Sequence, residues 1–224
     1  MDITGIDLLG LDRVLKRGTG KIIEERDDAL LIRDDISGAY MLACRNEAAG
    51  IPLLDRCIGE ECGLLMVSNH KLGKAAFERY GFSGMMECYQ VAYYGDKPTP
   101  DASLTVRTAN KGDLSVLTEN YNLISPEELE KVVENRSVLL GYHDGLLVGF
   151  IGEHLEGSMG LLYVFPEYRR RGFAAALQTH LIVKTLDEGF VPFGQVEKDN
   201  RKSLDLQEKL GMTVSDNLIV WMWK

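Results

Sequence analysis

Residues 162–174 have the sequence Leu-Tyr-Val-Phe-Pro-Glu-Tyr-Arg-Arg-Arg-Gly-Phe-Ala. The apolar start predicts a strand that ends at Pro166, and the basic turn after it leads through Gly172 directly into a predicted helix. A helix N-terminus exposes unpaired N–H groups and the positive end of the helix dipole, so it binds phosphate well. Gly172 has no side chain to keep a ligand from the backbone, and the three arginines supply planar donors for phosphate oxygens. The pattern indicates a phosphate-binding turn, although a solvated basic turn before a surface helix fits the same residues.

The chain on both sides of this turn alternates between predicted helices and strands. The helix from residue 172 is predicted to end near 187, because Gly189 is suited to the left-handed position after a helix. Upstream, Ser125-Pro126-Glu127-Glu128 has the N-cap, proline and acidic first turn that open a helix. Asp144-Gly145 between two apolar runs predicts a hairpin. The predicted strands of this half are 103–107, 138–142, 146–150, 160–164, 191–197 and 218–223, with a further helix at 201–209.

The first hundred residues contain a similar set of predicted elements. Two apolar runs, 29–33 and 39–43, flank a polar turn and predict a hairpin. Residues 95–101 are rich in turn residues and contain two prolines, which favour extended backbone and indicate a domain boundary. We therefore predict two domains, 1–97 and 98–224. The other elements predicted in the first domain are helices at 8–15, 47–59 and 70–80 and strands at 63–67 and 86–94.

The two halves resemble each other weakly. When Gly81 is aligned with Gly211, Glu78-Arg79-Tyr80 lies beside Glu208-Lys209-Leu210, and each glycine follows a predicted amphipathic helix. A predicted strand precedes each helix, and another follows each glycine. Because glycine is the commonest residue after a helix, chance explains part of this similarity. A diverged duplication is the interpretation that we carry forward.

Composition and charge exclude several classes of protein. The chain has 224 residues, of which 45% are hydrophobic, enough apolar surface to offset the ordering entropy of a folded core. A formal net charge of −9 argues against a nucleic-acid binder, which neutralises phosphates with Lys and Arg. No apolar run approaches the roughly 18–20 residues that cross a bilayer, and the acidic N-terminus does not resemble a signal peptide. We expect a cytoplasmic protein that binds no membrane.

No metal site is predicted from the cysteines. Cys57 and Cys62 are five positions apart, outside the gap of about two to four residues found in zinc sites. The other two, Cys44 and Cys88, fit reduced thiols of a cytosolic protein. A dinucleotide-binding glycine fingerprint, a Walker loop and a Gly-x-Ser-x-Gly elbow are all missing from the sequence.

Arg169-x-x-Gly172-x-Ala174 after a Val-x-Pro-Glu-Tyr strand end resembles the coenzyme-A loop of the GCN5-related N-acetyltransferases, the GNAT superfamily. A second family element follows in the expected order, Val-Glu-Lys-Asp-Asn-Arg-Lys-Ser at 196–203 and then Leu-Gln-Glu-Lys-Leu-Gly-Met at 206–212. The resemblance extends over about residues 103–224 and is nearest to the glycine-N-acyltransferase-like branch. It implies a mixed α/β (α+β) acyltransferase fold with an acyl-coenzyme-A-binding catalytic domain at 98–224. Residues 1–97, which have no such loop, are then a degenerate GNAT-like domain.

The resemblance also implies where acetyl-coenzyme A binds. The strand backbone at Tyr163 and Val164 would pair with the pantetheine arm, and the amides of the arginine turn would hold the pyrophosphate. Asn200 would hydrogen-bond the cofactor, with Ser203 one helical turn later, and Asn200 is equally suited to cap the next helix. The implied cofactor-binding residues are Tyr163, Val164, Arg169, Arg170, Arg171, Gly172, Phe173, Ala174, Asn200 and Ser203.

Two positions depart from the family pattern. Many members have a tyrosine that protonates the leaving thiolate, and Gln207 stands at that position here. Glutamine can donate a hydrogen bond but cannot act as an acid at neutral pH. The acidic residue often found early in the cofactor strand falls near Ser158, which leaves Glu153 and His154 as the nearest candidates for a general base. Strand alternation lets only one of these two face the cleft, and an ordinary strand position fits His154 as well.

The expected function is therefore transfer of an acetyl or small acyl group from acetyl-coenzyme A to a primary amine of a small molecule or peptide. The amine would attack directly in a ternary complex, where positioning supplies much of the acceleration. The alternative is an acyl-coenzyme-A-binding sensor or interaction module without turnover, and the missing tyrosine and acidic groups support it. We also consider a homodimer for either function.

Overall fold

The computed structural model describes residues 1–45 and 47–224. The chain divides into two compact units. Unit 1 consists of residues 1–92, 195–208 and 212–224, and unit 2 consists of residues 93–194 and 209–211. Unit 1 therefore contains the last strand of the chain as well as the first.

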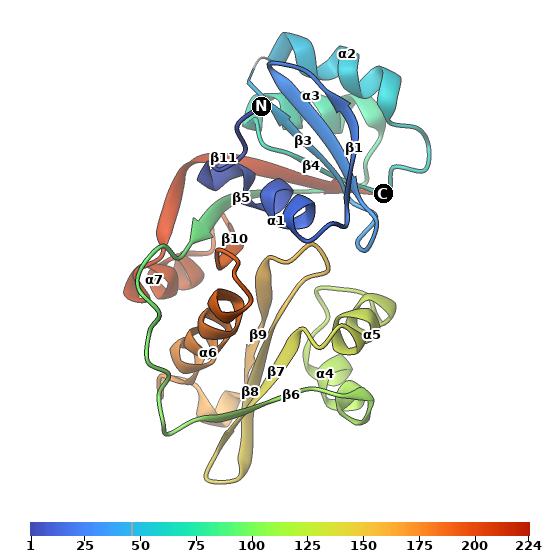
Figure 1. Cartoon of the computed structure of the whole chain (residues 1–224). Coiled ribbons are helices and arrows are strands. Elements are labelled where there is room, and N and C mark those ends of the chain that lie inside the picture. The colour runs from blue at the N-terminus through green and yellow to red at the C-terminus, as the bar shows by residue number, and fades with distance from the viewer. Residues whose placement is uncertain (46) are drawn as a thin grey trace. The chain divides into compact units, whose positions relative to one another are not determined.

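Unit 1 is a sheet with helices on both faces (Figure 1). Its elements are η1 (Ile6–Leu8), α1 (Leu9–Lys16), β1 (Gly20–Glu25), β2 (Ala29–Asp34), β3 (Tyr40–Cys44), α2 (Glu47–Cys57), β4 (Leu64–Val67), α3 (His70–Tyr80), β5 (Gly84–Ala92), the end of β10 (Phe193–Glu197), most of α7 (Arg201–Lys209) and β11 (Thr213–Trp223).

The last strand lies in the middle of this sheet. The strand order is β1-β2-β3-β4-β11-β5-β10. β11 is antiparallel to β4, with Val220 opposite Val67, and antiparallel to β5, with Val220 opposite Glu87. β3 and β4 are parallel, from Tyr40 opposite Leu65 to Leu42 opposite Val67. Their carboxyl ends, and the starts of the two helices that follow them, therefore lie at the same edge of the sheet.

Side-chain alternation along these strands builds two separate cores. On one face, Leu42 and Val67 pack with Leu53 and Leu54 of α2 and with Leu72 of α3. The opposite face carries Met41, Met66 and Trp221, which pack with α1 through Leu11 and Val14. Because both faces are covered, the central strands are apolar at nearly every position.

Unit 2 is an antiparallel sheet with α6 packed on it. The strands follow the order β9-β8-β7-β6, and each pairs with its neighbour in antiparallel fashion. Small residues let α6 approach closely, since a Cβ atom built on Gly141 would lie 2.6 Å from Leu177. The elements are β6 (Thr105–Thr108), η2 (Lys111–Asp113), α4 (Leu114–Asn120), α5 (Pro126–Glu134), β7 (Val138–His143), β8 (Leu146–Glu153), β9 (Met159–Val164), η3 (Pro166–Tyr168), α6 (Phe173–Asp187) and the start of β10.

The mixed α/β fold predicted from the sequence is confirmed, and so are its local signals. The Ser125 side chain caps α5 at the Glu128 N–H. Asp144 and Gly145 have φ angles of 51° and 78° in the hairpin turn, as a turn with two left-handed residues requires. Gly81 and Gly211 both follow a helix with φ near 70°, at 67° and 71°. The last strand is longer than predicted, because β11 begins at Thr213 rather than at residue 218.

Candidate cofactor-binding site

The turn between β9 and α6 leaves a helix N-terminus open. Gly172 is the N-cap of α6, with a left-handed φ of 87°, and it makes no side-chain cap of the helix. The first turn also lacks acidic residues. A Cβ atom on Gly172 would meet nothing within 4 Å. The first amides of α6 therefore face open space that a side chain at position 172 would enter, and the helix dipole makes this space favourable for an anion.

The arginines of the turn are held by aromatic rings and by the backbone. Arg169 lies over the Tyr163 ring at 5.6 Å from its centroid, and its Nε donates to the Val164 carbonyl oxygen at 2.9 Å. Arg171 lies 5.1 Å from the centroid of the Phe173 ring. Arg170 has a left-handed φ of 63°, an uncommon conformation for a residue with a side chain. Three consecutive arginines thus precede the N-terminus of α6, where the helix dipole is positive.

The strand before the turn has an irregular backbone. Leu161 has a φ of 48° in the middle of β9, although its side chain is buried with an exposed fraction of 1%. The register between β8 and β9 shifts at the same place. Tyr121 lies close to the Leu161 backbone, and burial raises the pKa of the Tyr121 hydroxyl. Because such a φ is costly for leucine, the surrounding structure must hold this bulge in place.

One edge of β9 has little strand pairing within unit 2. Its partner on that side, β10, is parallel to it and pairs at Met159 with Gly194. In the described part of unit 2, no strand continues this pairing along Gly160–Val164. Pairing of the Tyr163 and Val164 backbone on that edge with an extended ligand, which the resemblance implies, stays a prediction. The Val164 carbonyl oxygen already accepts from Arg169 but has a second lone pair.

Glu153 and His154 lie on opposite sides of the sheet of unit 2. Glu153 is buried, and its Oε1 accepts from the Thr185 hydroxyl of α6 at 3.1 Å. His154 lies toward α5, where its Nδ1 is 3.9 Å from Glu128 Oε1. The His154 ring also occupies the space that a side chain at position 160 would take, so Gly160 of β9 makes room for it. The His154 side chain therefore packs directly against Gly160, next to the irregular part of β9.

The surroundings of His154 favour its charged form. Burial of the ring works against that form, but the negative charges of Glu128, 3.9 Å away, and of Glu156 outweigh it and raise the pKa of His154. Glu156 is itself buried and accepts a hydrogen bond from the Ser158 hydroxyl. Ser158 is thus next to the carboxylate of Glu156.

The other predicted site residues belong to unit 1. The Asn200 side chain accepts from the Ser203 N–H at 3.1 Å, so Asn200 caps α7. Its carbonyl oxygen accepts from the Leu204 N–H at 3.1 Å as well. Gln207 is buried with an exposed fraction of 5%. Contact of Asn200, Ser203 or Gln207 with a cofactor stays a prediction.

Reasoning from the sequence missed three residues that shape this part of unit 2. They are Tyr121, Glu128 and Leu161, which bond or hold the groups around β9. Tyr121 and Glu128 are far from β9 in the sequence, so only the tertiary fold brings them there. No local signal marks Leu161, because leucine is an ordinary strand residue.

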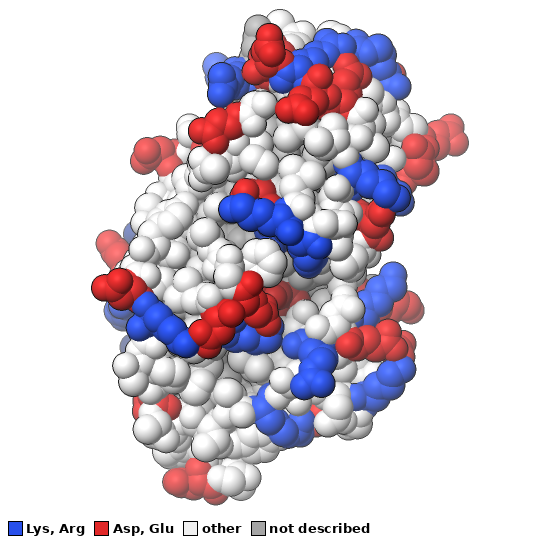
Figure 2. Space-filling model, viewed as in Figure 1, with Lys and Arg blue, Asp and Glu red and all other residues white. Residues whose placement is uncertain are grey.

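One face of the molecule is mixed in charge. On the face of the molecule in Figure 2, Lys and Arg side chains are interspersed with Asp and Glu. Among the described residues, no group of three or more His, Cys, Asp or Glu side chains could hold a metal ion. No helix within 1–45 and 47–224 is long and apolar enough to span a bilayer.

Comparison with protein families gives one match. The model of the acetyltransferase (GNAT) family matches residues 106–212. The matched segment runs from β6 to the end of α7 and includes the arginine turn and the start of α6. It supports the GNAT superfamily for this part of the chain. A comparison with curated proteins finds no match.

Solved structures with a similar fold cover almost the whole chain. A Drosophila melanogaster protein has a TM-score of 0.65 at 15% identity, over 100% of this chain and 90% of its own. A GCN5-related N-acetyltransferase-like protein from Streptococcus suis has a TM-score of 0.58 at 18% identity, over 96% and 92%. A tandem GNAT protein from the clavulanic acid biosynthesis pathway has a TM-score of 0.50 at 15% identity, over 87% and 77%. At these identities the similarity is one of fold.

Proposed function

We propose that this protein is a GNAT-type acyltransferase that moves an acetyl or small acyl group from acetyl-coenzyme A to a primary amine of a small molecule or peptide. The observation that carries the proposal is the turn at residues 169–174. It combines three arginines with a left-handed glycine at the open start of α6, and it lies inside the segment that matches the family. The amides of this turn would bind the pyrophosphate, and the free edge at Tyr163 and Val164 would bind the pantetheine arm.

The reaction needs a base more than it needs an acid. The amine nitrogen forms a bond to the thioester carbonyl carbon, the carbon–sulfur bond breaks, and coenzyme A leaves as a thiolate. A thiol has a pKa of about 8.5, so the thiolate is a stable leaving group and Gln207 would only orient its surroundings. The proton that the ammonium group of the acceptor loses requires a base. We assign this role to the neutral form of His154, because its ring lies beside Gly160 of β9 and next to Glu128, whose negative charge would stabilise the imidazolium once the proton has been taken.

The division of labour along the chain belongs to the same proposal. Residues 98–224 would carry the cofactor site, and residues 1–97 would be a degenerate copy of the fold. The left-handed glycines that end α3 and α7 support the duplication, as does the similarity to a protein described as a tandem GNAT. The glycine-N-acyltransferase-like branch, the cytoplasmic location and the homodimer stay predictions.

Calorimetry with coenzyme A tests the cofactor site. A valine at position 172 would enter the space in front of the first amides of α6, so Gly172→Val should abolish binding. Gly189→Val is the matched control, because Gly189 also has a left-handed φ of 81° with nothing within 4 Å of its Cβ position. It lies at the other end of the same helix, roughly 25 Å away. If folded Gly172→Val binds coenzyme A as tightly as the wild type, the site lies elsewhere.

Release of free thiol from acetyl-coenzyme A, measured with a panel of primary amines, separates the enzyme from a sensor. Turnover with at least one amine is expected, whereas a sensor would bind the cofactor without amine-dependent release. With the best amine, His154→Gln should lower kcat/KM by about 100-fold. Gln207→Ala and Glu153→Gln should have smaller effects. A large loss at Gln207 with His154→Gln unaffected would reverse the assignment of roles.

A further inference from the structure

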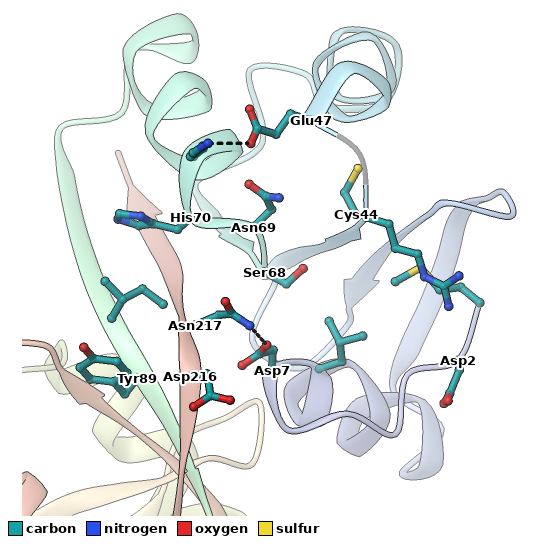
Figure 3. Close-up of a pocket in the computed structure, with 15 residues that line it drawn as sticks. Asp2, Asp7, Cys44, Glu47, Ser68, Asn69, His70, Tyr89, Asp216 and Asn217 are labelled. Carbon is teal, nitrogen blue, oxygen red and sulfur yellow. Dashed lines mark hydrogen bonds and ion pairs between the residues drawn. The ribbon is translucent and has the colours of Figure 1, made fainter.

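Unit 1 contains a cavity of about 680 Å³ that the proposed reaction does not use. It lies where the parallel strands β3 and β4 end and α3 begins, and η1, β5 and β11 complete its walls. Figure 3 shows Ser68 and Asn69 at the β4–α3 junction, with Asp7, Asp216 and Asn217 from η1 and β11 near them. The carboxyl ends of parallel strands are a common place for ligands, and this volume is within the range of small-molecule sites.

One part of the lining offers hydrogen-bond donors and positive charge. Asn69 caps α3 by accepting from the Leu72 N–H at 3.0 Å, so the first amides of an eleven-residue helix point toward the cavity end of β4. The Ser68 hydroxyl lies beside them. The Lys71 side chain is 81% exposed, and its Nζ is 4.0 Å from Glu47 Oε1. An exposed ion pair at this distance is weak, so the Lys71 ammonium group stays available to a ligand. This part is suited to a carboxylate.

Another part offers acceptors that are incompletely used. Asp7 Oδ2 accepts from the Asn217 amide at 3.1 Å. Asp7 Oδ1 is buried and has no hydrogen-bond partner within residues 1–45 and 47–224. A buried carboxylate oxygen without a partner costs free energy, which a cationic group next to Asp7 would offset. Asp216, also on the lining, is exposed and forms no ion pair with any described residue.

The balance of charges selects between classes of ligand. The lining side chains include four carboxylates, on Asp2, Asp7, Glu47 and Asp216, and two permanently charged bases, Arg45 and Lys71. Four carboxylates disfavour a polyphosphate such as a nucleotide. A simple amine would leave the donors at the start of α3 unused. A molecule that carries both charges satisfies both parts of the lining.

We propose that this cavity binds a small zwitterion of the amino-acid or dipeptide class. Its ammonium group would lie near Asp7 and Asp216, and its carboxylate would lie at the start of α3 near Ser68 and Lys71. The site belongs to unit 1 and does not depend on the arginine turn of unit 2.

A thermal-shift screen of the full-length protein without coenzyme A provides the test. The probes are the twenty common amino acids and a set of glycine-containing dipeptides, and calorimetry follows for the best one. We expect at least one zwitterion to raise the melting temperature. Its N-acetyl and C-terminal amide forms, which each lack one charge, should bind at least tenfold more weakly. A screen in which no probe raises the melting temperature, or in which the blocked forms bind equally well, overturns the proposal.

Variants locate the binding on these residues. Asp7→Asn keeps the shape of the side chain and should lower the affinity for the best probe at least tenfold. The control Asp96→Asn, at an exposed position outside the cavity, should leave that affinity unchanged. If Asp7→Asn lowers the melting temperature of the free protein, Asp216→Asn and Lys71→Met are used in its place, and each should also lower the affinity for the best probe. Gly172→Val should keep zwitterion binding in full, which distinguishes this site from the cofactor site. Binding of two coenzyme A molecules per chain, with the second displaced by Lys71→Met, would also overturn the proposal.

Discussion

Glu87 of β5 shows how strongly a single carboxylate is held in unit 1. It accepts from Lys198 at 2.6 Å and from His70, and these hydrogen bonds lower the pKa of Glu87 to about 2. Since an unfolded glutamate has a pKa of about 4.3, the ionised group stabilises the fold above that pH. The contribution is lost as the pH falls toward 2.

The hydrogen bonds of Glu87 with Lys198 and His70 should make a pH-dependent contribution to stability. Glu87→Gln should lower the free energy of unfolding at pH 7 by about 1 kcal/mol, and its deficit relative to the wild type should shrink as the pH falls from 5 to 3. Urea denaturation across this range measures the deficit. Glu78→Gln, an exposed position on α3, should show no such trend. A deficit at Glu87 that does not change with pH would mean that packing, and not charge, is responsible.

His154 should show the opposite dependence on pH. Its pKa is raised in the folded protein by Glu128 and Glu156, so its protonated form stabilises the fold below the unfolded value of about 6.5. This contribution is lost as the pH rises through the folded pKa. His154→Gln should therefore cost more at pH 5.5 than at pH 8.5, by about 1 kcal/mol. Equal costs at both pH values in chemical denaturation would contradict the raised pKa. When His154→Gln is introduced into a Glu128→Gln background, the difference between its costs at pH 5.5 and pH 8.5 should be mostly lost.

At the scale of elements, Asn200 tests whether a helix cap and a cofactor contact coincide. Its side chain satisfies the Ser203 N–H at the start of α7. Asn200→Ala should lower the free energy of unfolding by about 1 kcal/mol, and Asn200→Asp should retain most of it, because both Asn and Asp are good caps. Coenzyme A affinity gives the second readout. If Asn200→Asp keeps the stability but lowers the affinity for coenzyme A, the Asn200 side chain both caps α7 and contacts the cofactor. If the affinity is unchanged, Asn200 is a cap alone.

The elements that the sequence predicted best have signals of their own. His70–Tyr80 and Arg201–Lys209 coincide with predicted helices, because each ends before a left-handed glycine. β1 and α4 were not predicted. β1 (Gly20–Glu25) is an edge strand with four of its six residues exposed and no clear alternation, so burial leaves little pattern in its sequence. α4 (Leu114–Asn120) is seven residues long with one buried leucine, too short for a helical period to stand out.

The site follows the same rule. The arginine turn could be predicted because its chemistry lies within six consecutive residues. The group around His154 could not, because Tyr121, Glu128 and Leu161 meet only through tertiary packing. The cavity of unit 1 is lined from six elements and likewise leaves no local pattern.

At the scale of the molecule, β11 decides which parts of the chain can fold alone. It lies between β4 and β5 in unit 1 and buries Ile219, Val220 and Met222. A chain that ends at residue 211 would leave β4 and β5 without their shared partner and would expose both cores. We expect it to be insoluble or unfolded, and we expect the isolated segment 1–97 to fail in the same way.

Soluble expression and circular dichroism measure whether the shortened chain and segment 1–97 fold, with a chain that lacks only Lys224 as the control. A synthetic peptide of residues 212–224, added during refolding of the shortened chain, should restore part of the native signal. A cooperative thermal transition in segment 1–97 alone would show that β11 is dispensable for unit 1.

The central place of β11 also sets an order in time. The ribosome makes β4 and β5 before Ala92, yet the strand that separates them begins at Thr213. While the intervening residues are being translated, β4 and β5 have no β11 to pair with, so their edges and apolar side chains stay exposed. Pairing across so long a segment closes a large loop and is slow. A newly made chain should therefore depend on chaperones until its synthesis reaches β11, and it should be most prone to aggregate during that interval.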